Sequence, residues 1–258
     1  MLYFIQRIIG VKRKKTLRVS FSAPRTGSKP QRRYHGHMKT ALVIGASGGI
    51  GQAISAELAL QGHQVTLVSR SRDGLDIRSE ASIKSALNRF EGPFGLIFIA
   101  TGALQINGAK PEKSLRHLSE TALQDQFAVN ATGPALILKH SLRLLPRDKR
   151  CVIAALSARV GSIGDNRLGG WHSYRAAKAA LNQIIHGAAI EIARTHKQAI
   201  CVALHPGTVA TSFTKDFVNP DKATPPEETA KSLLNVLNNL TPKDTGNFYD
   251  YAGKPIPW

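Results

Sequence analysis

Tyr174 and Lys178 have side chains and a spacing that could move a proton. They stand four residues apart in an alanine-rich, helix-compatible stretch, 173–196, so a helix would place both on one face, one turn apart. An ammonium group close to a phenol favours the phenolate and brings its pKa of about 10 closer to neutral pH. The pair therefore predicts general acid–base chemistry, although this spacing is also common on solvated helices.

Two further polar residues follow elements that could bring them to this pair. Ser157 ends the apolar run 151–156, and strand ends are where parallel α/β folds place chemistry. Asn130 lies within a long helical segment, 120–145, shortly before Gly133-Pro134. It could simply occupy an irregularity next to the proline, or it could anchor a water molecule or Lys178.

A glycine-rich loop predicts a nucleotide site. The apolar run 40–44 leads into this loop, and a helical pattern follows over 53–60. In such a unit the glycines let the backbone approach a pyrophosphate, which the helix N-terminus attracts. Tight turns that bind nothing also need glycine. The predicted contacts are Gly45, Ser47, Gly49, Ile50 and Gly51.

The second strand, 64–68, indicates which dinucleotide binds. At the end of this strand an acid would hold the ribose 2′-hydroxyl, whereas arginine accommodates a 2′-phosphate. The sequence there is Ser69-Arg70-Ser71-Arg72, without an acid. Ser69 and Arg70 therefore predict NADP(H) in preference to NAD(H), unless the two arginines only cap a loop.

Too few residues follow this strand for a crossover helix and a third strand, because the next helix is already predicted over 79–90. We therefore expect Asp76 and Ile77 to cross directly over the adenine end of the cofactor. Strand 64–68 would then form the edge of the sheet.

Two later strand ends complete the predicted cofactor site. Strand 96–100 ends at Ala100, Thr101 and Gly102, which could lie along the cofactor. Strand 199–204 leads to a turn whose backbone and threonine hydroxyls could meet a nicotinamide carboxamide. The predicted contacts in that turn are Pro206, Gly207, Thr208, Val209 and Thr211. The irregular segment 213–226 is a natural substrate lid, and a helix over 227–238 and a strand over 248–251 follow it.

Together these elements predict one α/β domain, 38–258, built on a Rossmann-type doubly wound parallel sheet. Six strands are expected in the order 2-1-4-5-6-7, numbered as in a seven-stranded sheet whose third strand and crossover helix are missing. Cys151 and Cys201 both fall in apolar runs and indicate small buried side chains. No Cys/His spacing predicts a metal site.

The net charge of +18 is concentrated at the N-terminus. Residues 1–37 hold ten of the 35 Lys and Arg and none of the 17 Asp and Glu, so we expect a basic, disordered extension. This extension resembles an organellar transit peptide, and its basic run 12–15 could touch nucleic acid or anionic lipid. In the simpler interpretation Met38 is the functional start, and the residues before it have no role. No apolar run reaches the ~18 residues of a membrane span, and we expect a cytoplasmic protein.

The order and spacing of these motifs resemble those of the short-chain dehydrogenase/reductase family from Met38 to the C-terminus. The Gly-Trp-His-Ser-Tyr lead-in and the Phe-Tyr-Asp-Tyr-Ala-Gly-Lys-Pro-Ile-Pro-Trp ending are similar to the branch of C-factor and sniffer-type carbonyl reductases. The residues that carry the family resemblance are Gly45, Gly49, Gly51, Asn130, Ser157, Tyr174, Lys178, Pro206 and Gly207.

The resemblance implies an oxidoreductase that transfers hydride between NADP(H) and a carbonyl or secondary alcohol. Tyr174 would be the general acid/base, and Lys178 would lower its pKa and bind the nicotinamide ribose. Ser157 would hold the substrate oxygen, and Asn130 would join the proton relay. Ala100-Thr101-Gly102 departs from the family's Asn-Ala-Gly and lacks the Asn that braces the sheet.

The resemblance also implies a homodimer or homotetramer, because family members usually associate through two long helices, which correspond to 120–145 and 172–196. The alternative function is a non-catalytic NADP(H)-binding sensor or signalling protein on the same fold, which would have no need of the Ser-Tyr-Lys set. A small-molecule carbonyl or alcohol is the expected substrate, and nucleic acid is expected to bind, if at all, only through the basic tail.

Overall fold

The computed structural model describes residues 38–217 and 219–258, and the predictions for residues 1–37 concern a segment outside the described residues. Six parallel strands form one sheet in the order β2-β1-β3-β4-β5-β6. This is the predicted order once the missing third strand is left out of the count, so the doubly wound α/β fold is confirmed. The strands are β1 (Thr40–Ile44), β2 (Gln64–Val68), β3 (Leu96–Ile99), β4 (Cys151–Leu156), β5 (Ala199–His205) and β6 (Phe248–Asp250).

The central strands end at one level, which creates a common edge for a site. Ile44 pairs with Val68 of β2 and with Ile99 of β3, and Leu156 pairs with Leu204. Every residue of β3 and β4 is buried, because helices cover both faces of the sheet. A parallel strand in this position is apolar throughout, which is why these segments were recognisable as continuous hydrophobic runs.

Within the described residues β2 forms one edge of the sheet, as predicted. Its end leads into a four-residue helix, α2 (Arg70–Asp73), which the sequence analysis did not predict. The Ser69 hydroxyl caps this turn by accepting a hydrogen bond from the Arg72 N–H at 3.2 Å. The next helix, α3 (Glu80–Asn88), begins after Ser79, which accepts from the Ser82 N–H, so the predicted helix is confirmed.

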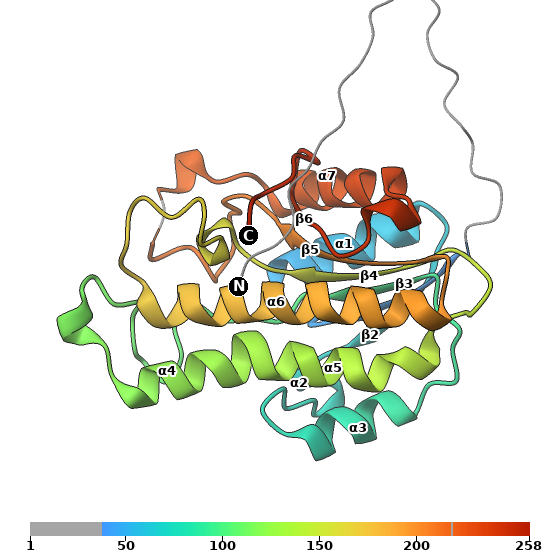
Figure 1. Cartoon of the computed structure of the whole chain (residues 1–258), viewed down its shortest axis with the longest axis horizontal. Helices are drawn as coiled ribbons and strands as arrows, with labels where there is room; N and C mark the ends of the chain where they lie inside the picture. The colour runs from blue at the N-terminus through green and yellow to red at the C-terminus, as the bar shows by residue number, and fades with distance from the viewer. Residues whose placement is uncertain (1–37, 218) are drawn as a thin grey trace, which may run out of the picture. The chain divides into compact units, whose positions relative to one another are not determined.

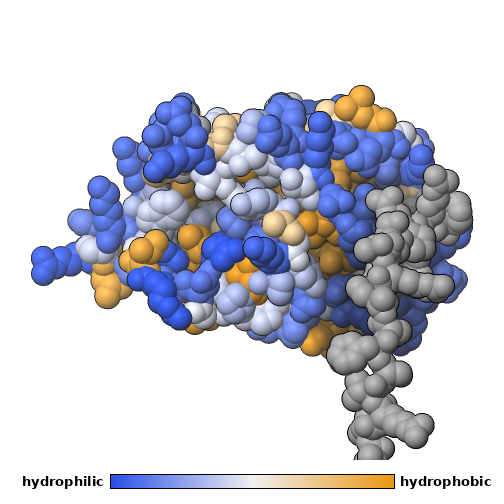
Figure 2. All heavy atoms as spheres, turned by 90° about the horizontal axis from the view of Figure 1, so that it is seen from above, coloured by the Kyte–Doolittle hydropathy of each residue, from blue (hydrophilic) through white to orange (hydrophobic). Residues whose placement is uncertain are grey.

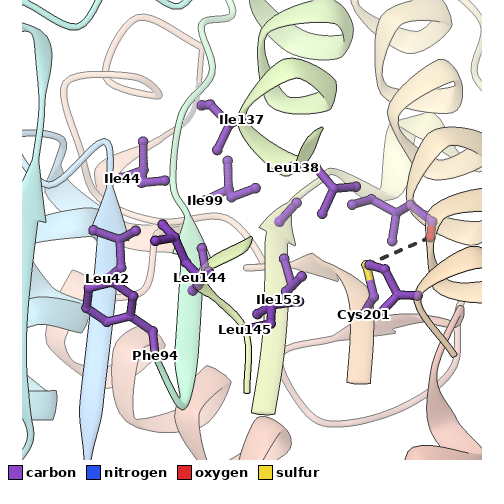
Figure 3. Packing of buried hydrophobic residues seen from close by; sticks show 14 of the residues in the cluster. Leu42, Ile44, Phe94, Ile99, Ile137, Leu138, Leu144, Leu145, Ile153 and Cys201 are labelled. Atoms are coloured by element: carbon purple, nitrogen blue, oxygen red, sulfur yellow. Dashed lines mark hydrogen bonds between the residues drawn. The ribbon is translucent and has the colours of Figure 1, made fainter. Parts of the chain in front are cut away.

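Two helical layers enclose the sheet (Figure 1). The long helix α6 (His172–Thr195) runs on one face beside the row formed by α4 (Glu120–Phe127) and α5 (Gly133–Ser141). On the other face α1 (Gly49–Leu60) and α7 (Pro226–Asn239) lie together. Two buried apolar clusters, one on each face, join the layers. In the first cluster, Ile44, Ile99 and Ile153 of the sheet lie towards Ile137 and Leu138 of α5 (Figure 3).

The segment predicted as one helix over 120–145 is divided into four pieces. They are α4 (Glu120–Phe127), the π-helical turn η2 (Ala128–Thr132), α5 (Gly133–Ser141) and the 3₁₀ turn η3 (Leu142–Leu144). The irregularity expected near Asn130 is therefore present, and it takes the form of a π turn, a feature that often occurs at functional sites. Pro134 stands at the start of α5, where its missing N–H is tolerated.

The remaining elements are short 3₁₀ turns: η1 (Leu115–His117), η4 (Arg159–Gly161), η5 (Pro220–Lys222) and η6 (Pro242–Asp244). Cys151 and Cys201 are buried free thiols, as predicted, and the Cys201 thiol faces the Ile185 carbonyl oxygen (Figure 3). Seen from the α7 side, hydrophilic residues cover most of the surface (Figure 2). None of the described helices combines the length and apolar character that crossing a membrane requires.

Candidate active site

A cavity of about 460 Å³ opens at the carboxyl edge of the sheet. Its wall contains parts of the glycine loop, of the segments after β3, β4 and β5, and of the first turns of α6. Parallel α/β sheets bind ligands at this edge, so the cavity lies where the fold predicts a site. The predicted residues that line it are Gly49, Ile50, Gly51, Ala100, Thr101, Gly102, Ser157, Tyr174, Lys178, Pro206, Gly207, Thr208, Val209 and Thr211.

Three glycines of the loop, Gly45, Gly49 and Gly51, are packed too tightly to carry a side chain. Gly45 has a left-handed φ of +89°, and a Cβ on it would lie 2.8 Å from the Ala100 carbonyl carbon. A Cβ on Gly51 would lie 2.2 Å from the Gly45 carbonyl oxygen, and one on Gly49 would lie 2.6 Å from Thr211 Cγ2. Ser47 lies in the same turn, just before α1.

The start of α1 fits the phosphates of a dinucleotide. Its N-cap is Gly48, and within the described residues no side chain caps it, so the first N–H groups of the helix are available to an anion. Thr101 adds a second indication, because its buried hydroxyl has no hydrogen-bond partner among the described residues. A buried polar group without a partner calls for an explanation, and a bound nucleotide would provide one.

Tyr174 and Lys178 are both buried on the cavity wall, 5% and 3% exposed. Lys178 Nζ lies 5.8 Å from the centre of the Tyr174 ring and donates a hydrogen bond to the Leu156 carbonyl oxygen at 2.9 Å. Helix α6 therefore presents the pair on one face, as their spacing predicts.

The pKa values differ from the sequence expectation. Burial raises the pKa of Tyr174 above its usual value, whereas the sequence argument expected Lys178 to lower it. Burial also lowers the pKa of Lys178, to about 7. Both shifts have one cause, the cost of a charged side chain in an apolar interior, and at neutral pH they favour a protonated phenol.

Ser157 reaches the cavity from the end of β4, but its hydroxyl already has a partner. It donates a hydrogen bond to Asn182 Oδ1 at 2.6 Å, and Asn182 Nδ2 donates to the Gly161 carbonyl oxygen at 3.3 Å. The second bond fixes which end of the amide faces Ser157. Asn182 lies one helical turn after Lys178, and the sequence analysis did not identify it.

Asn130 is fully buried beside the cavity. Its Nδ2 donates to the Ala103 carbonyl oxygen at 2.8 Å and to Gln126 Oε1 at 2.7 Å, while its Oδ1 accepts from the Ala103 N–H. A Cβ on Gly102 would lie 3.0 Å from Asn130 Oδ1 and 3.4 Å from Lys178 Nζ. The side chain therefore ties the π turn to the loop after β3, next to Lys178.

The predicted adenine-end residues lie outside the cavity wall. The Ser69 N–H donates to Asp73 Oδ2 at 2.9 Å, and Asp73 also pairs with Arg89 at 3.2 Å. Arg70 is exposed at the start of α2. Asp76 accepts from the Arg78 backbone N–H, which is the largest cause that lowers the pKa of its carboxyl group.

Ile77 packs against the helix row. A Cβ on Gly133 would lie 2.2 Å from Ile77 Cγ1, so the segment that replaces the third strand contacts the start of α5. This close contact explains why a residue without a side chain is needed at that point of the row.

The turn after β5 and the lid form the far wall. Gly207 has a left-handed φ of +80°, and the Tyr251 ring lies where its Cβ would be. The Thr214 hydroxyl bonds to the Val209 carbonyl oxygen and so joins the lid to the turn. His205, which the sequence analysis did not identify, also lines the cavity, and burial lowers its pKa to about 4.

A glycine cradle at a helix N-terminus, at the carboxyl edge of a parallel sheet, defines the dinucleotide-binding class of α/β proteins. The profile of the family described as short chain dehydrogenase matches residues 39–222. The chain therefore belongs to the short-chain dehydrogenase/reductase family, and it is an oxidoreductase with a nucleotide-binding fold. The family resemblance found in the sequence is confirmed.

Individual relatives agree with this assignment. The chain is 28% identical over 236 residues to 1-hydroxy-2-glutathionyl-2-methyl-3-butene dehydrogenase of Rhodococcus sp. (strain AD45), covering 86% of this chain and 100% of the relative. A short-chain dehydrogenase/reductase of Burkholderia multivorans, solved with bound NADP, superposes with a TM-score of 0.69 at 26% identity and covers 85% and 99% of the two chains. The carbonyl reductase Sniffer of D. melanogaster shares the fold, with a TM-score of 0.71, 20% identity and coverage of 86% and 100%.

Proposed function

We propose that this oxidoreductase transfers hydride between NADP(H) and a carbonyl or secondary alcohol, with Tyr174 as the general acid/base. The observation that carries the proposal is the shared cavity: Ser157, Tyr174 and Lys178 line the same space as the glycine loop. Carbonyl reduction requires a protein to hold three groups around one space: a proton donor, a charged or polar neighbour, and a nucleotide-binding loop.

The cofactor would be held by the glycine loop, by Thr101 and Gly102 after β3, and by the turn 206–211 after β5. When bound, the nicotinamide supplies the hydride, and the protein orients it. The free N–H groups at the start of α1 would meet the pyrophosphate. Lys178, whose amino group donates to the Leu156 carbonyl oxygen, would contact a ribose hydroxyl with its remaining hydrogens.

In the reducing direction Tyr174 would donate a proton to the oxygen of the substrate. The phenol is protonated at neutral pH, as a donor must be, and burial raises its pKa further, which makes it a weaker acid. Ser157 would hold the same oxygen, after releasing its bond to Asn182. Asn130, which joins the loop after β3 to the π turn beside Lys178, would support the return of a proton from solvent.

NADP(H) is proposed in preference to NAD(H). Arg70 is exposed at the end of β2, where a 2′-phosphate would lie. The acid nearest in sequence, Asp73, is held by the Ser69 N–H and by Arg89, so it is less available to a ribose hydroxyl. The relative from Burkholderia multivorans was solved with NADP, which supports the same choice.

We also propose that the protein is a homodimer or homotetramer. The outer side of α6 exposes Ile190, 53% accessible, and the end of α4 exposes Phe127, 37% accessible. Burial of such side chains between subunits is favourable. Sedimentation or light scattering tests this proposal, and a monodisperse monomer contradicts it.

The function is tested by following NADPH and NADH oxidation with a panel of aldehydes, ketones and quinones, together with a direct measurement of NADPH binding. The proposal expects turnover of at least one carbonyl compound and a higher kcat/KM with NADPH. Tight NADPH binding without turnover of any member would instead support a sensor, and absence of nucleotide binding would contradict both.

A further inference from the structure

We propose that Glu112 is a positioning residue for Trp171, and that Trp171 selects substrates with a flat, uncharged group beside the carbonyl. The inference rests on the proposed carbonyl reduction and specifies the substrate end of the same cavity. Neither residue belongs to the acid–base set. Glu112 lies in the loop before η1, whereas Trp171 is the residue before α6.

Trp171 has a backbone conformation that side chains rarely adopt. Its φ is +51°, and it follows Gly169 and Gly170 with φ of +62° and +65°. Glycine adopts this conformation readily, but a tryptophan in it is strained unless neighbouring groups hold it, and such strain is concentrated at functional sites. This turn leads directly into helix α6, and Trp171 lies three residues before Tyr174.

Glu112 holds this turn in place. Its backbone carbonyl oxygen accepts the Trp171 N–H, and its buried carboxylate accepts from the N–H and the hydroxyl of Ser173. On the other side, Arg175 Nε donates to the Gly170 carbonyl oxygen at 2.9 Å. A carboxylate at the start of a 24-residue helix also suits the positive end of that helix. The backbone of Glu112 therefore holds the turn at Trp171, and its carboxylate holds Ser173 in the first turn of α6, directly after that turn.

The ring of Trp171 completes an aromatic wall, which we define as Trp171, Tyr174, Phe213 and Phe217. The Trp171 ring stands edge-on to Tyr174 at 6.3 Å and to Phe217 at 6.1 Å, and Phe213 lies 6.4 Å from Tyr174. All four line the cavity. Aromatic rings prefer edge-on or offset neighbours at these distances, so a flat ring attached to the carbonyl would extend the arrangement.

The charges near this wall favour an uncharged substrate. Arg159 lines the cavity, but its guanidinium pairs with Asp165 at 3.0 Å and with Asp250 at 3.2 Å. Its charge is therefore largely balanced within the protein. Asp216 of the lid adds a negative charge to the lining, which would disfavour an anionic group.

The test uses benzaldehyde and cyclohexanecarbaldehyde, which have similar size and differ in flatness. The readout is the ratio of kcat/KM for the two aldehydes in each variant, divided by the wild-type ratio, so that intrinsic reactivity cancels. Trp171→Leu is expected to lower the ratio by about two- to tenfold. Glu112→Gln should also lower the ratio, with NADPH affinity retained. Glu120→Gln, at an exposed position of α4, should leave the ratio unchanged.

Rescue distinguishes positioning from general damage. Glu112→Asp keeps the carboxylate and should recover part of the ratio that Glu112→Gln loses, while circular dichroism reports whether each variant folds. Active variants that all retain the wild-type ratio would overturn the inference and leave the carbonyl reductase proposal intact. Wild type that reduces neither these aldehydes nor any other carbonyl compound would overturn the proposed function itself.

Discussion

Gly51 and Gly187 allow the close packing of the nucleotide loop to be tested with one kind of substitution. Both lie in helices, α1 and α6, so alanine gains up to about 1 kcal/mol of helix propensity at each position. Within one protomer a Cβ on Gly187 meets nothing within 4 Å, whereas a Cβ on Gly51 would lie 2.2 Å from the Gly45 carbonyl oxygen. Because overpacking costs about 1–3 kcal/mol, Gly187→Ala should stabilise the fold and Gly51→Ala should destabilise it.

Thermal unfolding with and without NADPH measures both effects. A change of 1 kcal/mol in a protein of this size shifts Tm by roughly 2–4 °C, so the two variants should differ by several degrees in opposite directions from wild type. NADPH should still raise the Tm of Gly187→Ala but have little effect on Gly51→Ala, because relief of the clash moves Gly45 in the loop. A Gly51→Ala protein as stable and as responsive to NADPH as wild type would refute the reasoning.

Three further predictions concern the cofactor, the serine and the buried lysine. Arg70→Ala should weaken NADPH binding roughly tenfold or more and should weaken NADH binding little. Arg72→Ala, an exposed position on the same short helix, is the control. Equal losses of affinity for both nucleotides would contradict the 2′-phosphate site. Asn182→Ala removes the acceptor of the Ser157 hydroxyl and should lower the free energy of unfolding by about 1–3 kcal/mol. Asn182→Asp keeps an acceptor and should retain a higher kcat than Asn182→Ala. Because the Lys178 pKa is about 7 in the folded protein, the unfolded state binds more protons than the folded state between pH 7 and 10. The free energy of unfolding of wild type should therefore rise with pH over this range, relative to Lys178→Met, by roughly a few kcal/mol. A difference between the two proteins that does not change with pH in urea titrations would contradict that shift.

The sequence predicted the sheet well because its signals are local. Continuous apolar runs mark the buried strands of a parallel sheet, and the short interval after Arg72 excluded a third strand and its crossover. Over residues 38–217 and 219–258 the structure confirms both predictions. The π turn around Asn130 was expected only as an irregularity, since the choice between a kink and a π turn depends on contacts with the loop after β3.

The surroundings of the candidate site could not be predicted to the same extent. Asn182 could have been suspected from its spacing to Lys178, but its bond to Ser157 joins residues 25 positions apart. Glu112 reaches Ser173 across 61 positions, and no local pattern encodes that contact. The predicted direction of the Tyr174 pKa shift was wrong for a related reason. The spacing to Lys178 was visible in the sequence, whereas the burial that dominates the shift is a property of the folded chain.

The most direct test of the central claim is kcat/KM for reduction of a carbonyl substrate by NADPH in wild type, Tyr174→Phe and Tyr249→Phe. Tyr249 lies on β6 outside the cavity lining and serves as the matched control. We predict that Tyr174→Phe loses at least about 10²-fold in kcat/KM and still binds NADPH as tightly as wild type, while Tyr249→Phe remains close to wild type. A Tyr174→Phe enzyme with wild-type kcat/KM would contradict the assignment of Tyr174 as the general acid/base.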